Sequence, residues 1–248
     1  MALIKSNAEI AILRQGGQKL AEVLAEARQF VRPGLKLVDL DAFIYQQIEA
    51  RGSTPSFLGH EGFPNASCLS LNEQIVHGIP DQRVLKDGDV LGIDVGLWYK
   101  KLCVDSAITV IVGAGTPEAE QLLKVTEQAL EKGIKAAKPF RRVGSISHAV
   151  QEVGQKHGYG IVRTLTGHGV GHHVHEPPEV PNWGEPGDGA LLKPGMVLAI
   201  EPMFTLGSGE VVTEIDGWGV IAADHTLSAH FEHTIAITGR GVEVLTRI

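Results

Sequence analysis

The amino-acid sequence predicts an α/β fold of the α+β kind, with a pseudo-twofold antiparallel central sheet covered by helices. Three observations predict it. The chain resembles itself, each half carries two helix signals before two apolar strand-like runs, and an acidic residue lies in or beside each of those runs. Two copies are too few for a solenoid, so we expect one domain over residues 1–248, with halves at roughly 7–113 and 116–240.

The helices of the first half are marked by their start signals. Ser6 and Glu9 form a capping box before an amphipathic run that continues to about Val31. A Pro-Gly pair then breaks that run. Asp39 can cap a second helix, which we expect to continue to about Ala50.

The second half repeats this pattern. Thr-Pro-Glu at 116–118 opens a helix to about Lys138, and Ser145 opens another to about His157. The strand runs repeat more clearly, because LKDGDVLGID resembles LKPGMVLAIE and VDSAITV resembles FEHTIAI. Acid falls on acid in both alignments, with Asp94 matching Glu201 and Asp105 matching Glu232.

The stretch LGIDVGLWYKKLCVDSA predicts a hairpin with an acid inside each strand. A turn centred just after Tyr99 would place Asp94 directly opposite Asp105, and like charges at that separation are destabilising. Buried carboxylates are costly unless they are paired or bind a metal. A solvated hairpin with two exposed acids is the simple alternative. If Glu201 and Glu232 converge on the same centre, however, the four acids require cations, and two divalent ions balance the charge better than one.

Composition bounds the class of protein. The 248 residues are 43% hydrophobic and 21% charged, with a net charge of −7. We therefore expect no nucleic acid as the main ligand. Cys68 and Cys103 are too few for a disulfide framework, which indicates a reducing cytoplasm. The charged N-terminus indicates no signal peptide, and no apolar run reaches the ~18 residues of a membrane span.

Histidines crowd the glycine-rich segment TGHGVGHHVHEPP. We expect this segment to be a strand, on which His173 and His175 share one face and His172 points the other way. We favour His168 and His175 as functional residues, because the segment comes shortly before the second acidic strand. His172 and His173 are more typical of ordinary surface or satisfied core histidines than of ligands. His77 ends an apolar run before the first acidic strand, so it can reach the same cleft.

Five motifs together resemble the methionine aminopeptidases, which are short members of the pita-bread metallopeptidases. The motifs are NEQIVHGIP, IDVGLWYKKLCVD, TGHGVGHHVHEPP, IEPMF and FEHT, and their order and spacing match over essentially the whole chain. The resemblance implies the pita-bread fold. The short segment between His175 and Glu201 leaves no room for the inserted subdomain of the type 2 branch, so the chain resembles type 1. The two cysteines exclude an N-terminal zinc-finger extension.

The resemblance also implies the metal ligands. Asp94 would chelate one ion, Asp105 and Glu232 would bridge both ions, and His168 and Glu201 would bind the other. Four carboxylates and one imidazole form a hard ligand set, which suits Mn, Fe or Co best, with Zn also compatible.

The implied reaction is removal of an N-terminal methionine. A hydroxide held by the two ions would attack the first peptide carbonyl, with Glu201 as proton shuttle. His175 would stabilise the tetrahedral intermediate and His77 would contact the substrate near the scissile amide. The free α-amine of the substrate would ligate a metal. We expect a cytoplasmic monomer, without a membrane partner, that acts on peptide or nascent-chain N-termini; docking to the ribosome stays open.

The segment GHEGFPNASC matches the family's methionine pocket, with departures. Bacterial type 1 relatives usually carry tyrosines at His60 and Phe63, a histidine at Glu61 and often a phenylalanine at Val174. The residue changes favour ordinary drift over an altered preference, because swapping one or two pocket groups shifts selectivity by only ~1–3 kcal/mol. The expected pocket comprises His60, Phe63, Cys68, Val174 and Trp218.

Two other functions compete with this hypothesis. GVGHHVHEPP also resembles Xaa-Pro peptidases of the same fold, but these usually carry a large extra N-terminal domain, for which 248 residues leave no room. A pita-bread binding module without catalysis is the rival from another class. Such modules typically lack the metal ligands, and all five candidates are present here.

Overall fold

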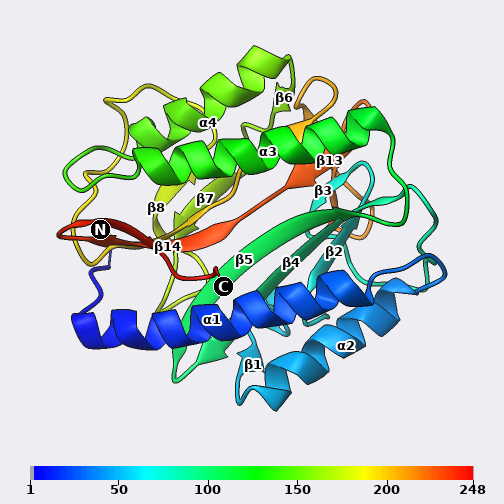
Figure 1. The fold of residues 1–248 in the computed structure, drawn as a ribbon, viewed down its shortest axis with the longest axis horizontal. Coiled ribbons are helices and arrows are strands. Elements are labelled where there is room, and N and C mark those ends of the chain that lie inside the picture. Colours follow the sequence, from blue (N-terminus) through cyan, green and yellow to red (C-terminus); the bar gives the residue numbers. More distant parts are fainter. Residues whose placement is uncertain (1–2, 248) are drawn as a thin grey trace.

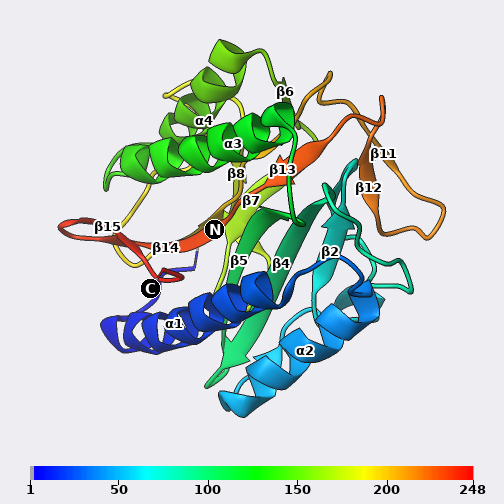
Figure 2. The ribbon, with the colours of Figure 1, turned by 45° about the vertical axis from the view of Figure 1, so that its right-hand side comes forward.

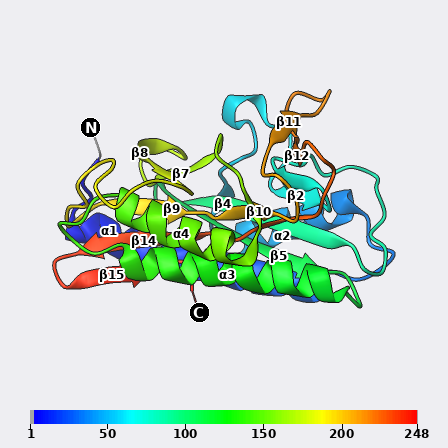
Figure 3. The same ribbon diagram turned by 90° about the horizontal axis from the view of Figure 1, so that it is seen from above.

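The computed structural model describes residues 3–247. Four helices flank the strands in two pairs, one pair for each half of the chain (Figure 1). Seen from above, α3 (Pro117–Ala136) lies on one side of the strands, and the hairpin of β11 (Val211–Thr213) and β12 (Val220–Ala222) lies on the other (Figure 3). The helices are α1 (Asn7–Phe30), α2 (Leu37–Ala50), α3 (Pro117–Ala136) and α4 (Gly144–His157).

The strands are short except for one central hairpin. That hairpin joins β4 (Val90–Tyr99) to β5 (Leu102–Ile111). The short elements of the first half are β1 (Thr54–Pro55), the 3-10 turn η1 (His60–Gly62), β2 (Cys68–Leu71) and β3 (Gln74–Val76). The second half contains β6 (Gly160–Ile161), β7 (Thr166–Gly169), β8 (Glu176–Pro181), β9 (Val197–Ile200), β10 (Met203–Thr205), β11 (Val211–Thr213), β12 (Val220–Ala222), β13 (Ser228–His230), β14 (His233–Thr238) and β15 (Gly241–Val244).

The first helix of each half begins where its cap predicts. Ser6 accepts from the backbone of Glu9 and the Glu9 side chain accepts from Ser6, so the capping box is confirmed. Thr116 likewise caps α3 by accepting from the backbone N–H of Ala119.

The second helix of each half begins earlier than its sequence predicts. Asp39 lies in the first turn of α2 and does not cap it. Backbone pairing between distant segments sets both starts, through the antiparallel bridges Lys36 to Val84 and Arg142 to Leu191. The matching bridges show that the two halves are built alike.

The register of the β4–β5 hairpin differs from the expected one. Tyr99 pairs with Leu102, so the turn consists of Lys100 and Lys101, both in the left-handed region. This two-residue turn matches the twist of a hairpin. Asp94 therefore lies opposite Ala107 rather than Asp105. The shift is an even number of residues, so the two acids remain on one face of the sheet, as diagonal neighbours.

The sheet that contains β4 and β5 meets the sheet that contains β9 and β14 along β5 and the start of β14 (Figure 1). Ala107 and Glu232 exchange backbone hydrogen bonds of 2.9 and 3.4 Å. Beside them, the Thr234 hydroxyl donates to the Asp105 carbonyl at 2.7 Å and accepts from the Asp105 N–H at 3.0 Å. The junction of the halves thus fixes the backbone of Asp105 and Glu232 together, as the pseudo-twofold pita-bread arrangement requires.

Among residues 3–247, none of the helices has the length and apolar character needed to cross a lipid bilayer.

Candidate metal centre and substrate cavity

A cavity of about 170 Å³ opens beside the junction of the two sheets. The predicted acids lie on its wall together with three of the predicted histidines. These seven residues are Asp94, Asp105, Glu201, Glu232, His77, His168 and His175. Residues far apart in the sequence therefore converge on one small space.

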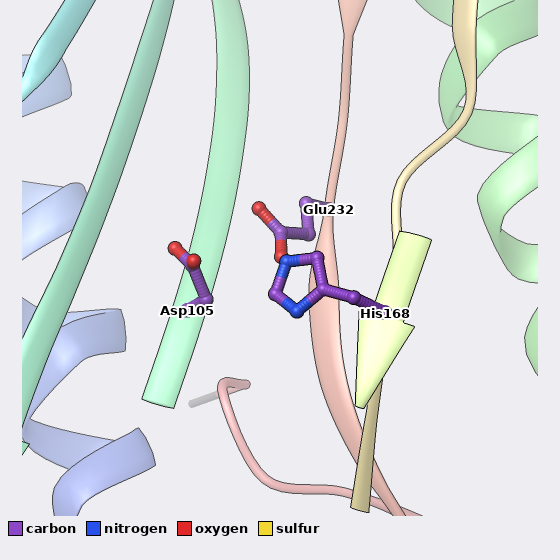
Figure 4. A group of neighbouring side chains, drawn as sticks. All are labelled: Asp105, His168 and Glu232. Carbon is purple, nitrogen blue, oxygen red and sulfur yellow. The ribbon is translucent and has the colours of Figure 1, made fainter. Parts of the chain in front are cut away.

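Three of the seven have the spacing of a metal site. Ligand atoms of Asp105, His168 and Glu232 all lie within 4.8 Å of one another. Figure 4 shows these side chains pointing toward a shared space from β5, β7 and the segment before β14. The His168 Nδ1 lies 2.8 Å from the Gly169 carbonyl. Donation there leaves Nε2 free as a ligand, and Nε2 lies 3.6 Å from Glu201 Oε1.

Unpartnered oxygens show that these residues fit a divalent cation. Within the described residues, Oδ1 of Asp94, Oδ1 of Asp105 and Oε1 of Glu232 are buried without a hydrogen-bond partner. Buried polar atoms are normally satisfied, and a carboxylate without a partner is costly. Oxygen and imidazole donors suit hard or borderline divalent ions. A cation would supply the missing partner for all three.

Burial sets the protonation of this cluster. It raises the pKa of Asp94 and Glu232 well above their usual range, that of Asp105 to about 7 and that of Glu201 to about 8. Neighbouring carboxylates add to the effect at Asp94, Asp105 and Glu232. Burial lowers the pKa of His168 to about 3, which keeps its imidazole neutral. Protons and cations therefore compete for the same oxygens.

His77 follows β3 directly and has φ of 58°. This left-handed conformation is uncommon for a residue other than glycine and is found more often at functional sites. Burial lowers the pKa of His77 to about 4, so its ring is neutral at physiological pH. A neutral imidazole in the cavity wall can donate or accept a hydrogen bond.

The segment carrying His172, His173 and His175 is a loop between β7 and β8, so the expected strand was wrong. Glu176 organises this loop. Its Oε1 accepts from the backbone N–H of His172 at 2.5 Å and of His173 at 3.0 Å, and its Oε2 forms an ion pair with Lys5. Both side chains of this ion pair are only 1% exposed.

The loop aims its histidines in different directions. The His175 ring lies 4.5 Å from the His168 ring and 5.5 Å from the His60 ring, between their centroids. Partial burial lowers the pKa of His175. His172 instead pairs with Glu9 at 2.7 Å, and neither it nor His173 lines the cavity. Both side chains are exposed, which is one of the two ordinary placements expected for them.

Most of the expected side-chain pocket lines the same cavity. Phe63 packs edge-on against Trp218 with ring centroids 5.2 Å apart. Cys68 pairs with Asp94 across β2 and β4, and burial raises the pKa of its thiol. Val174 was predicted wrongly. The loop turns it into the hydrophobic core, where it is 2% exposed, and it does not line the cavity.

The sequence did not point to several residues of the site. His230 is buried at the end of β13, with Nε2 3.5 Å from Glu201 Oε2. Its position two residues before Glu232 was the available signal, since alternate residues of a strand share a face. The cavity wall also contains Phe57, Val76, Leu165, Thr166 and Met203.

The chain matches the model of metallopeptidase family M24 over residues 11–239. It is 44% identical to methionine aminopeptidase 1 of Bacillus subtilis and 45% identical to the methionine aminopeptidase of Clostridium perfringens, with 100% of both chains covered in each case. The crystal structure of methionine aminopeptidase from Thermotoga maritima superposes with a TM-score of 0.98 at 41% identity, covering 100% of both chains.

Prolidase from Pyrococcus furiosus also superposes, with a TM-score of 0.82 over 100% of this chain and 66% of its own. At 22% identity this likeness shows the shared fold alone. The family model, the full-length relatives and the converging acids agree: the chain belongs to metallopeptidase family M24.

Proposed function

We propose that this chain is a divalent metal-dependent aminopeptidase that removes the N-terminal methionine from peptides and nascent proteins. The observation that carries the proposal is the convergence of four acids and His168 on a small cavity that apolar side chains also line. Relatives at 44% and 45% identity are named methionine aminopeptidases. The prolidase alternative rests on the shared fold and on the one motif GVGHHVHEPP.

We further propose two ions at this centre. Asp94 would hold one, His168 and Glu201 the other, while Asp105 and Glu232 would bridge them. Bound divalent ions supply the Lewis acidity that activates water and polarises a carbonyl. Mn, Fe or Co suit this donor set best, and Zn is also compatible.

The residues of the chain would move and hold the protons. Glu201 would accept a proton from the attacking water and pass it to the leaving amine. The neutral imidazole of His175 would donate a hydrogen bond to the developing oxyanion. His77 would contact the amide being cleaved.

The dimensions of the cavity favour an exopeptidase. A space of about 170 Å³ accepts one side chain and the atoms beside it. Phe63, Cys68 and Trp218 suit an unbranched thioether. The rest of the peptide substrate would extend into an adjoining open groove of about 800 Å³, which shares Thr166, His168 and His175 with the cavity.

Release of amino acids from Met-Ala-Ser, Leu-Ala-Ser and Ala-Pro-Ser, with added Mn and with chelator, tests the proposal. We expect methionine release alone, and its loss in chelator. Preferential cleavage before proline would replace the substrate assignment, and no release with any metal would favour a binding module.

We also propose that residues 1–248 work as one catalytic domain, in a cytoplasmic monomer that acts on nascent chains.

A further inference from the structure

His230 is a buried imidazole beside Glu201 of the candidate metal centre, outside the cavity. It is 3% exposed, and its Nε2 has no hydrogen-bond partner among residues 3–247. The Nε2 atom of His230 lies 3.5 Å from Oε2 of Glu201. His230 does not line the cavity, so a bound peptide would not touch it.

The backbone around His230 is fixed on both sides. Its N–H donates to the Thr109 hydroxyl at 3.0 Å, and that hydroxyl donates to the His230 carbonyl at 2.6 Å. On the other side, His230 pairs with Met203 across β13 and β10. The ring therefore has a set position relative to Glu201, which lies two residues before Met203.

Glu201 is held between two imidazoles. Its Oε1 faces His168 at 3.6 Å and its Oε2 faces His230 at 3.5 Å. Its backbone carbonyl accepts from Asn182 Nδ2 at 3.0 Å, so the backbone is anchored independently of the carboxylate. Hydrogen bonds at catalytic sites are often long in the free protein and shorten in the working complex.

We propose that His230 is a positioning residue, which donates its Nε2–H to Oε2 of Glu201 and so directs Oε1 toward the cation site beside His168. This inference rests on the proposed function, because it takes Glu201 as metal ligand and proton shuttle. Partners that orient metal ligands typically contribute 10- to 100-fold in metal affinity or activity.

The test compares His230→Leu with His230→Gln. The leucine removes the donor, while the glutamine amide nitrogen reaches a similar place. Isothermal titration of the metal-free proteins with Mn should show roughly 10- to 100-fold weaker binding for the leucine variant and near wild-type binding for the glutamine variant. For Met-Ala-Ser, kcat should fall in the same order with KM little changed, and the pH profile of kcat/KM should shift only in the leucine variant.

His233→Leu is the matched control. His233 is also a largely buried imidazole, but its Nδ1 lies 2.9 Å from the Thr246 hydroxyl and it does not line the cavity. Its loss should lower the unfolding temperature without changing Mn affinity. If His230→Leu does not fold, His230→Asn is the second variant. Its shorter side chain stays polar but holds the amide donor out of reach of Glu201, so the same loss of Mn affinity is expected.

A folded His230→Leu protein that binds Mn and turns over like wild type would overturn the inference. The two proposals fail separately. If the wild type releases no amino acid but Mn binding still falls in the leucine variant and recovers with glutamine, the proposed function fails and the positioning role stands. If the wild type cleaves Met-Ala-Ser and every variant behaves alike, only the positioning role fails.

Discussion

The two halves of the molecule hold their acids in different ways. In the first half, Asp94 and Asp105 lie inside the ten-residue strands β4 and β5, which a two-residue turn connects. In the second half, Glu201 follows the end of β9 and Glu232 precedes the start of β14. The chain between them contains β10 to β13 and includes the hairpin that projects from the body in Figure 2.

This difference bears on the cavity more than on the acids. The shared pattern supplies equivalent acids on both sides of the junction. The segment between the two glutamates is far longer than the turn between the two aspartates, and it supplies Met203 and Trp218 to the cavity wall and His230 beside Glu201. Phe63 of the first half lines the same cavity, so both halves contribute to the candidate metal centre and to the pocket.

The largest effect is expected at the junction of the halves. Asp105→Asn and Glu232→Gln should each abolish methionine release and reduce the number of bound Mn ions, because both carboxylates face the same cluster. Activity and metal content measured on purified protein check this. Asp39→Asn, an exposed carboxylate on α2, is the control. Retained hydrolysis in either site variant would show that the two halves do not share one centre.

The next effect concerns the ion pair between Lys5 and Glu176, which joins the N-terminal segment to the His175 loop. Lys5→Met leaves a buried carboxylate without its partner, which should cost about 3–5 kcal/mol of folding free energy. It should also lower kcat, because Glu176 fixes the loop backbone. Urea denaturation and steady-state kinetics measure the two effects.

Arg14→Met is the matched comparison for this ion pair. Arg14 also joins the N-terminal region to the second half, by pairing with Glu243, but these side chains are 44% and 34% exposed. Exposed pairs contribute about 0–1 kcal/mol. Equal losses for Lys5→Met and Arg14→Met would contradict the proposed role of burial at the His175 loop.

A smaller effect is expected from pH in the metal-free protein. Because the folded pKa values of Asp105 and Glu201 are raised to about 7 and 8, the folded state binds more protons than the unfolded state, and stability falls as pH rises through these values. Buried His77 and His168, with lowered pKa values, oppose this only below about pH 6.5.

Between pH 6.5 and 8 the carboxyl groups therefore dominate. Each one contributes up to about 1.4 kcal/mol per pH unit. The unfolding temperature of the protein in chelator should decrease as pH rises across this range. Saturating Mn should remove the decrease, because the cation replaces the protons. Stability that rises with pH in the chelated protein would mean that the acids ionise without a cation.

The smallest effect tests the side-chain pocket, to which both halves contribute. Phe63→Ala removes a wall of the cavity and should reduce the preference for methionine over leucine by at least about tenfold in kcat/KM. Val174→Ala should leave this ratio unchanged, because Val174 lies in the core and not in the cavity. If Val174→Ala shifts the ratio as strongly, the pocket extends further than the structure shows.

The candidate ligands could be predicted from the sequence because their signals are local. Two of these signals lie within short stretches: acids that interrupt apolar strands, and a glycine-rich run of histidines. The order of the motifs can be read directly along the chain, and ligand chemistry depends on residue type. The same holds for the capping box at Ser6 and the cap at Thr116, since each involves neighbouring residues only. The sequence alone thus determined the two halves, the candidate ligands and the family resemblance.

Only the tertiary structure decided the register and the supporting contacts. Lys100 and Lys101 carry no glycine or asparagine signal for a tight turn, and the pairing of β4 with β1 and β2 accompanies the observed register. The placement of Val174, the starts of α2 and α4, and the approach of His230 to Glu201 likewise depend on segments distant in the chain. Such contacts form only when the halves pack together, so no local pattern encodes them.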